Sequence, residues 1–391
     1  MQFGLAVQIK NERVFSKWKQ LEVLIMIMVS VSPLLENSVR LPIILAATLV
    51  RIKDFSNISI PKQKYAIYWV MIAALAISSL FDVRNVSSLS PYSILNAYFP
   101  ICVTYGFIFS SFYRLDELLH YIGNIAFVGA CFSLVGMLVI YFAPQVINYL
   151  PSYTYGGYTH KTAIAFNVLF ADGLLVTRNA GFAREPGVFQ LLLNLGVLYE
   201  SGRRSQFQLL KLIILGLAIV LTQSTVGLII YALIMLKVMR DVPGAKYIVA
   251  AVMIIFFAQL SAIFNYQLNV KLIGSDSFDA RFDPMVRAIL MGADNPLGLG
   301  NTGYTTVYAT AGIGSFDSFS QILVRYGYIP FAIMLYLYGC LAKENLFLFF
   351  AIFLTSLSQN IWFEPLIITI LFIPLSDGAL TTMSHLRSAI Q

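Results

Sequence analysis

Charged residues are scarce in this chain, because only 12% of its 391 residues are Asp, Glu, Lys or Arg, where a soluble domain averages about 25%. Cysteine is scarce too, and Cys102, Cys131 and Cys340 all lie in apolar segments without the paired spacing of a disulfide framework or a metal site. Walker A, GxGxxG after a strand, HExxH and Ser/His/Asp arrangements are also missing from the sequence. A water-soluble globule is therefore excluded, and we expect neither ATP, a metal ion nor another cofactor.

Apolar residues make up 58% of the chain and form successive runs of about 15 to 25 residues, the length that a helix needs to cross roughly 30 Å of hydrocarbon. This pattern predicts an all-α polytopic membrane protein with about twelve transmembrane helices, organised as a single transmembrane domain over residues 1–391. The predicted spans are 21–35, 39–50, 65–81, 92–112, 118–142, 185–199, 207–221, 225–238, 247–264, 319–341, 346–357 and 361–375.

The positions of the basic residues predict the sidedness of these spans. Placing the N-terminus inside puts most Lys and Arg residues in cytoplasmic connections, so both termini are expected in the cytoplasm. The first twenty residues lack the compact apolar region and cleavage site of a removable signal peptide, and we expect the first helix to be its own insertion signal. The basic residues that break the rule belong to two external connections or to the helices beside them: Lys161, Arg178, Arg184, Lys271, Arg281, Arg287 and Arg325.

Two external loops are much longer than ordinary connections, and long ordered loops tend to be functional. The first covers residues 143–183 and is rich in Tyr and Gly. The second covers residues 265–318, and its segment FDARFDPMVRAILMG predicts an amphipathic helix because Phe282, Val286 and either Ile289 or Leu290 share one face. A glycine-rich turn, NPLGLGNTGY, follows this helix.

The end of the first loop carries the sharpest local feature, TRNAGFAREPGVF, in which Arg178, Arg184 and Glu185 lie at the start of a helix whose first turn contains Pro186. One interpretation makes Arg184 and Glu185 interfacial anchors, with Glu185 interacting with the helix dipole. The functional interpretation makes Arg178 and Arg184 bidentate ligands for an anionic group such as phosphate. Both interpretations are consistent with the sequence.

The second loop repeats this theme with Arg281 and Arg287, and Arg325 follows in the next helix. Arginines on a loop helix are often only solvated, but paired arginines in both loops on one side predict a basic external cavity. Asp317 has two interpretations: an N-cap of the following helix, or a carboxylate that orients or deprotonates a sugar hydroxyl. His160 is expected to be polar surface.

Several segments resemble the O-antigen (Wzy-type) oligosaccharide repeat-unit polymerases, within the wider polymerase and ligase family. The resemblance covers most of the chain in its layout of twelve spans with two dominant external loops. Locally it depends on GFAREPGVF (181–189), QSTVGLI (223–229), RAILMGADNPLG (287–298) and DSFSQILVRYG (317–327). The absence of a histidine between Asn265 and Lys343 favours a polymerase over a ligase.

The resemblance implies a membrane glycosyltransferase in the bacterial cytoplasmic membrane. Such an enzyme moves a growing glycan from one undecaprenyl pyrophosphate to a newly flipped lipid-linked repeat unit, without a metal, and has a flippase and a chain-length regulator as possible partners. The candidates for the catalytic base are Asp317, Glu185 and the substrate itself. The ligands of pyrophosphate and glycan that the resemblance implies are Arg178, Arg184, Arg281 and Arg287. Arg325 and Tyr304 are further candidates for substrate binding.

Other functions remain open at the level of sequence. A flippase or transporter of lipid-linked oligosaccharide also needs about twelve helices and a basic cavity, although two similar halves and charges within the helices would then be expected. An O-antigen ligase or a non-catalytic assembly partner are further alternatives.

Overall fold

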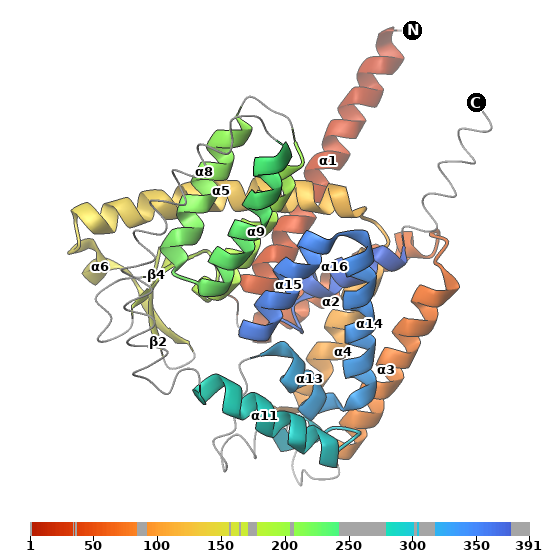
Figure 1. Ribbon diagram of the computed structural model, residues 1–391. Coiled ribbons are helices and arrows are strands. Elements are labelled where there is room, and N and C mark those ends of the chain that lie inside the picture. The colour runs from red at the N-terminus through yellow and green to blue at the C-terminus, as the bar shows by residue number, and fades with distance from the viewer. Residues whose placement is uncertain are drawn as a thin grey trace. The chain divides into compact units, whose positions relative to one another are not determined.

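The computed structural model describes residues 2–33, 35, 37–83, 92–155, 158–163, 166–170, 178–203, 207–241, 279–300, 303–304 and 317–376. Within these ranges the chain is mostly helical, with fourteen α-helices, a short 3-10 helix and one four-stranded sheet (Figure 1). The helices are α1 (Gln2–Val31), α2 (Asn37–Phe55), α3 (Lys62–Val83), α4 (Tyr92–Phe109), α5 (Leu115–Phe142), α6 (Val146–Tyr149), α7 (Pro186–Ser201), α8 (Gln208–Thr222), α9 (Thr225–Asp241), α11 (Asp279–Asp294), α13 (Ser318–Tyr326), α14 (Tyr328–Glu344), α15 (Leu346–Ser358), α16 (Pro365–Phe372) and the 3-10 helix η2 (Ile373–Leu375).

The predicted spans that fall on described residues all coincide with helices, whereas the span at 247–264 lies outside the described residues. The ends of several helices differ from the predicted bounds, and one predicted span is interrupted. The span predicted at 319–341 is divided into α13 and α14 by Gly327, whose φ of +81° and ψ of −168° stop the first helix. Only glycine adopts this backbone region without strain, so the break is a property of that residue.

The described chain divides into two compact units that are discontinuous in sequence. The first comprises Met1–Ile58, Tyr105–Leu228 and Glu364–Ile373, and the second comprises Ser59–Thr104, Ile229–Phe363 and Pro374–Gln391. In the first unit, α5 packs against α7 and α8, while α1 contacts α2, α5 and α16. The apolar side of α7 is almost fully buried by these neighbours.

The first external loop departs from the predicted all-α class because it contains an antiparallel meander. Its strands are β1 (Ser152–Tyr155), β2 (Tyr158–Ala163), β3 (Phe166–Phe170) and β4 (Arg178–Gly181), hydrogen-bonded in chain order. These segments are rich in Tyr, Thr, Val and Phe, which favour strands. Val168 of β3 packs on Ile140 of α5, so the sheet is attached to the helices of its own unit.

The end of the first unit that is predicted to be cytoplasmic holds a network of charges between helices. Arg51 of α2 donates to Glu22 of α1 at 2.5 Å, and the Tyr113 hydroxyl donates to the same carboxylate at 2.7 Å. Burial, followed by the neighbouring Glu22 carboxylate, raises the pKa of Tyr113, so its phenol stays protonated as a donor. Lys19 and Glu117 form a further ion pair at 2.7 Å.

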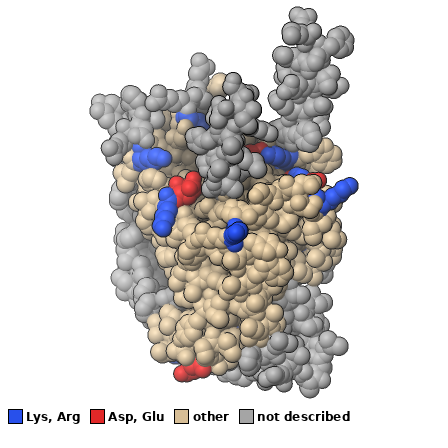
Figure 2. All heavy atoms as spheres, turned by 90° about the vertical axis from the view of Figure 1, so that its right-hand side faces the viewer, with Lys and Arg blue, Asp and Glu red and all other residues tan. Residues whose placement is uncertain are grey.

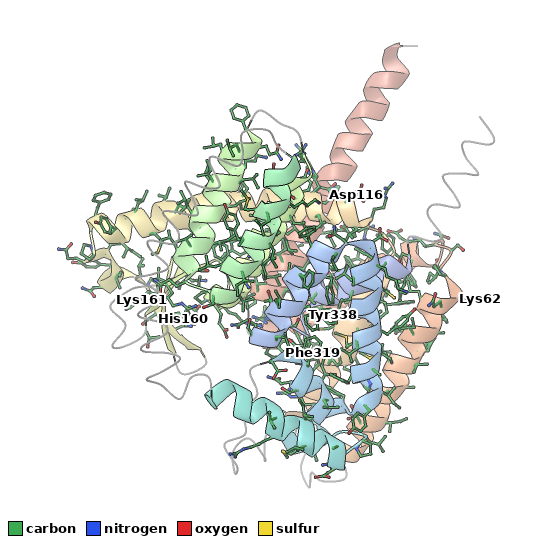
Figure 3. All side chains as sticks on the ribbon, viewed as in Figure 1. Lys62, Asp116, His160, Lys161, Phe319 and Tyr338 are labelled. Atoms are coloured by element: carbon green, nitrogen blue, oxygen red, sulfur yellow. The ribbon has the colours of Figure 1, made fainter. Side chains whose placement is uncertain are left out.

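The second unit is built around α13, which contacts α3, α11, α14 and α15. Phe319 of α13 contacts the ring of Tyr338 of α14 at 5.3 Å between centroids (Figure 3). Phe353 of α15 joins the same aromatic cluster at 5.2 Å from Phe319. Aromatic packing of this kind fixes the relative positions of the three helices.

Apolar side chains are exposed along whole helix faces. In the part of the chain that the structure describes, one helix, Leu115–Phe142, is both long and apolar enough to cross a membrane, and five shorter apolar helices accompany it. Only 28% of the most apolar 18-residue stretch of this helix is buried. Its Phe132 and Tyr141 are 59% and 79% exposed. Figure 2 shows a face that includes α3, where uncharged residues cover a broad area and charged side chains are few.

The break at Gly327 generates a test of the fold. A Cβ built on Gly298 would overlap the carbonyl oxygen of Arg325, and one on Gly327 would overlap the carbonyl oxygen of Pro296; both glycines have a φ of +81°. Gly298→Ala and Gly327→Ala should therefore each lower the free energy of unfolding by about 1–3 kcal/mol.

The matched control is Gly339→Ala in α14, where an added Cβ meets nothing within 4 Å and alanine has the higher helix propensity. Thermal unfolding of the three variants in detergent measures the effect. Equal midpoints for all three would show that the contact between the two glycines has no role in stability.

Candidate functional site

Three helix ends of the first unit meet near the end of the first external loop. The Arg184 amide donates to the carbonyl of Val31, at the end of α1, at 2.7 Å. The hydroxyl of Ser30 accepts from the Leu366 amide, in the first turn of α16, at 3.0 Å. Both α7 and α16 begin with Pro after a Glu, a sequence suited to a helix start because proline needs no amide partner there. The starts of α7 and α16 are thus attached to the end of α1.

Arg184 lies in this meeting point as a buried residue and forms an ion pair with Glu364 through its Nη1 atom. The two residues are only 3% and 1% exposed. Removing one partner of a buried ion pair strongly destabilises a protein, because the other charge is then left uncompensated in a medium of low polarity. The guanidinium of Arg184, which we predicted to bind an anionic ligand, thus has a structural carboxylate partner.

Arg40 is a second buried arginine near Glu364. Its Nε and Nη2 atoms donate at 2.6 Å to the carbonyls of Leu35 and Ser32, just beyond α1. It attracts the Glu364 carboxylate electrostatically, although no hydrogen bond joins the two among the described residues. The Oε2 atom of Glu364 is buried with no hydrogen-bond partner in the described part of the chain.

Arg178 lies in β4 and interacts with the turn between α8 and α9. Its Nε donates to the Thr222 carbonyl at 3.1 Å, and its Nη2 donates to the Gln223 carbonyl at 3.4 Å. Gln223 ends α8 in the left-handed conformation, with a φ of +52°. A cation beside the last carbonyls of a helix also complements the helix dipole. Arg178 therefore joins the first loop to the QSTVGLI segment.

A second contact joins α7, the helix that follows the first loop, to the QSTVGLI segment. Asn194 of α7 donates to the Gly227 carbonyl at 3.1 Å and to the Gln190 side chain at 2.9 Å. A Cβ on Gly227 would come 2.8 Å from the Gln190 side chain, so the two helices need glycine at this point. Ser224 accepts from the Gly227 amide at 3.3 Å and so helps to cap α9.

Glu185 is the N-cap residue of α7, but its side chain makes no capping hydrogen bond. It is half-buried, whereas the Glu364 carboxylate at the start of α16 is fully buried. Of these two Glu-Pro helix starts, only Glu185 retains partial access to solvent.

The second unit contains the other predicted residues. The helix α11 covers the segment for which the sequence predicts an amphipathic helix, and Arg287 is exposed on it beside the exposed Ile289 and Leu290. The side chain of Arg281 lies outside the described residues. Part of the glycine-rich turn packs on α13, because the Leu299 amide donates to the Val324 carbonyl at 2.8 Å.

Arg325 and Tyr304 lie together in the same unit. The guanidinium carbon of Arg325 lies 4.2 Å from the centre of the Tyr304 ring, a cation–π contact. Tyr304 is buried against Val324 and Leu299. Arg325 also lies in the last turn of α13, where a cation complements the helix dipole.

Asp317 caps α13, as one of the two interpretations of its sequence position predicts. Its Oδ1 accepts from the Ser320 amide at 2.7 Å, and its Oδ2 accepts from the Ser320 hydroxyl. The residue is only 5% exposed. Both carboxylate oxygens therefore have local partners, which fits a capping role.

Glu364 and Arg40 are buried charged residues that the sequence does not single out, and His160 is buried instead of lying on the surface. An acidic residue within an apolar run, FEPLII, was the available signal for Glu364, because an isolated charge there needs a partner. His160 was expected on the surface, yet it is buried in β2 and stacks on Tyr153 at 4.9 Å (Figure 3). Within the described ranges no three His, Cys, Asp or Glu side chains come together as metal ligands.

Variants of the ion pair test whether Arg184 has a structural role. Glu364→Gln should destabilise the protein by about 3–5 kcal/mol, because it leaves Arg184 buried without its counter-charge. The double variant Arg184→Met/Glu364→Leu should restore folded protein, because apolar pairs of similar volume replace buried ion pairs at little cost.

Glu185→Gln is the matched control for this series and should leave the unfolding temperature nearly unchanged. Protein level and thermal unfolding measure all three variants. Normal stability of Glu364→Gln would contradict a structural role for the pair.

Asp317 permits a comparison with a second N-cap in the same unit. Asn345 caps α15 by accepting from the Leu348 amide at 3.0 Å. Asp317→Ala and Asn345→Ala should each cost about 1 kcal/mol of stability. Asp317→Asn should be nearly silent, because an amide oxygen still accepts from the Ser320 amide. A loss of stability above about 3 kcal/mol in Asp317→Asn would show that the cap needs the charge.

Comparison with known proteins adds no assignment to this geometry. No protein-family model matches the chain, and a search of curated proteins gives no match.

Proposed function

We propose that this chain is a multi-pass enzyme of the bacterial cytoplasmic membrane. In this proposal it joins undecaprenyl-pyrophosphate-linked oligosaccharide repeat units into O-antigen or a related surface polysaccharide on the external face of that membrane. It would cross the membrane with about twelve helices and place both termini in the cytoplasm. The exposed apolar face of α5 supports the membrane placement, because a soluble protein would bury such a stripe.

One observation supports the polymerase more than any other: the four segments that carry the resemblance are brought together in two pairs, by their own residues or by residues that flank them. In the first unit, Arg178 and Asn194, which flank GFAREPGVF, donate to the Gln223 and Gly227 carbonyls of QSTVGLI. In the second unit, RAILMGADNPLG lies against DSFSQILVRYG through Gly298 and Gly327. Segments about 20 to 40 residues apart in the sequence are thus brought together in each unit, as expected if each pair forms part of a site.

The proposed reaction has three events that the protein must assist. An acceptor sugar hydroxyl attacks the anomeric carbon of the donor glycan, the bond from that carbon to the pyrophosphate oxygen breaks, and the hydroxyl proton passes to a base. Arginines stabilise the negative charge that develops on the departing pyrophosphate, and positioning of the two substrates lowers the barrier further.

The contacts assign these tasks differently among the predicted residues. Arg287 is exposed and is the best candidate to bind pyrophosphate, and Arg281 precedes it in the same helix, α11. Arg184 becomes a positioning residue, because its side chain is buried against Glu364. Glu185 is a better candidate base than Asp317, since the two oxygens of Asp317 already accept hydrogen bonds from Ser320.

Elongation of purified lipid-linked repeat units tests this proposal directly. The wild-type protein should lengthen the glycan without ATP, and a strain that lacks the gene should carry a surface glycan of one repeat. If Arg287 binds pyrophosphate through a bidentate fork, Arg287→Lys keeps the charge but loses the fork, and chain length should fall at unchanged protein level.

Arg114→Lys is the control, because Arg114 is equally exposed but lies on the predicted cytoplasmic side, beside Asp116. Full elongation by Arg287→Lys and Arg287→Ala would remove this residue from the site. Normal polymer in the deletion strain would reject the proposed function itself.

A further inference from the structure

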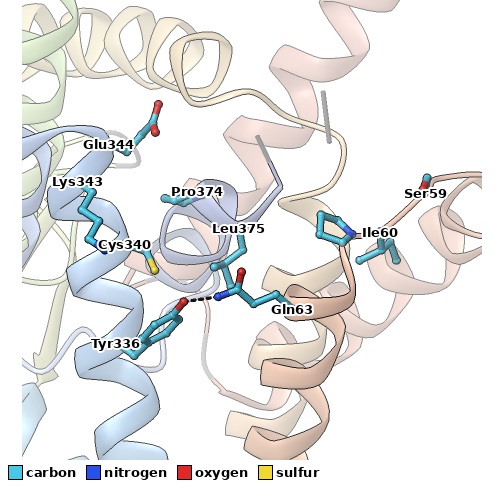
Figure 4. A pocket seen from close by; sticks show the side chains of 10 residues that line it. Ser59, Ile60, Gln63, Tyr336, Cys340, Lys343, Glu344, Pro374 and Leu375 are labelled. Carbon is cyan, nitrogen blue, oxygen red and sulfur yellow. Dashed lines mark hydrogen bonds between the residues drawn. The ribbon is translucent and has the colours of Figure 1, made fainter. Parts of the chain in front are cut away.

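A polar cavity opens in the second unit at the start of α3 and the end of α14. It has a volume of about 460 Å³, within the range of about 300–1,000 Å³ that is common for small-molecule sites. Its walls include Gln63 of α3, Tyr336, Lys343 and Glu344 of α14, and the segment Pro374–Leu375 (Figure 4).

One wall of the cavity is held by a buried lysine. The Nζ atom of Lys64, which is fully buried, donates to the Ser376 hydroxyl at 2.6 Å. Ser376 directly follows the wall residues Pro374 and Leu375. The contact therefore fixes that wall to α3, and the cavity is a built feature of the unit.

An apolar groove of about 610 Å³ lies along the same two helices. Its walls are Ala66 and Ile67 of α3 and Ile329, Ala332 and Ile333 of α14, and it shares Gln63 and Tyr336 with the polar cavity. Gln63 donates to the Tyr336 hydroxyl at 2.5 Å, so this hydrogen bond marks the boundary between the two compartments. A polar compartment that continues into an apolar one fits an amphipathic occupant.

The charges of the polar cavity indicate which kind of polar group an amphipathic occupant would carry. Lys343 and Glu344 supply one cation and one anion, both are exposed, and no ion pair involves either of them among the described residues. An anionic headgroup would satisfy Lys343 but be repelled by Glu344. A zwitterionic headgroup satisfies both residues.

We propose that this cavity and groove bind one glycerophospholipid with a phosphoethanolamine headgroup. Its phosphate pairs with Lys343, its ammonium pairs with Glu344, and an acyl chain lies in the groove between α3 and α14. The primary ammonium has three donors and suits a carboxylate better than the N–H-free ammonium of phosphocholine does. The inference rests on the membrane placement but not on polymerase activity, and the cavity adjoins segments predicted to be cytoplasmic.

Native mass spectrometry of the detergent-solubilised full chain tests the site. The probes are phosphatidylethanolamine, phosphatidylcholine and phosphatidylglycerol with identical acyl chains. The wild-type protein should retain the ethanolamine lipid about twofold to fivefold more tightly than either of the others, the range expected for one partly exposed charge pair.

Variants separate the three contacts. Lys343→Gln should weaken retention of all three lipids. Glu344→Gln should lower retention of the ethanolamine lipid and raise that of phosphatidylglycerol, because the attraction to the ammonium and the repulsion of the anion are lost together. Ala332→Phe should weaken all three by filling the groove, because Ala332 is exposed and tolerates a larger side chain. Lys53→Gln removes an exposed charge outside both compartments and should change nothing.

Equal retention of the three lipids by the wild-type protein would overturn the headgroup assignment. Unchanged retention in Lys343→Gln and Ala332→Phe would overturn the site. A dimer that Ala332→Phe dissociates without any effect on lipid would show that a second copy of the chain, instead of a lipid, covers the groove. Elongation activity that fails while lipid retention is normal would reject the proposed function but leave this site intact.

Discussion

The ion pair of Arg184 and Glu364 is the interaction on which the first unit depends most. Two opposite charges are taken out of water together, and each is tolerable only because the other is present. Their backbones begin α7 and α16, and hydrogen bonds from Arg184 and Leu366 attach both starts to the end of α1. The starts of α7 and α16 are therefore positioned by the pairing of Arg184 with Glu364 as well as by apolar packing.

This arrangement changes what the arginines of the proposed site do. Arg184 and Arg178 both donate to groups of the protein itself. Arg184 pairs with the Glu364 carboxylate, and Arg178 donates to the carbonyls at the end of α8. They hold the first loop against α1, α8 and α16. Direct ligand contact is thus assigned to side chains that remain exposed, of which Arg287 on α11 is the clearest.

The helices could be predicted from the sequence because apolar runs and charge placement act over a few residues at a time. The division at Gly327 and the role of Asp317 as a cap follow equally local rules. The sheet of the first loop is not predicted, because its strands are only four to six residues long, too short for a clear alternation of apolar and polar residues. The partner of Arg184 could not be predicted, because Glu364 is distant in the sequence. The residues around each of the two charges do not indicate with which other charge it pairs.

The distance along the chain between these partners has a consequence for synthesis. Glu364 is made 180 residues after Arg184, and Leu366 is made 336 residues after Ser30. While the ribosome is still translating the second unit, Arg184 has no counter-charge, so the first unit cannot reach its final packing until its last short segment arrives. A nascent chain that stalls before residue 364 would leave Arg184 without its ion-pair partner. The first unit, which begins the chain, is thus completed only by one of the last helices to be made.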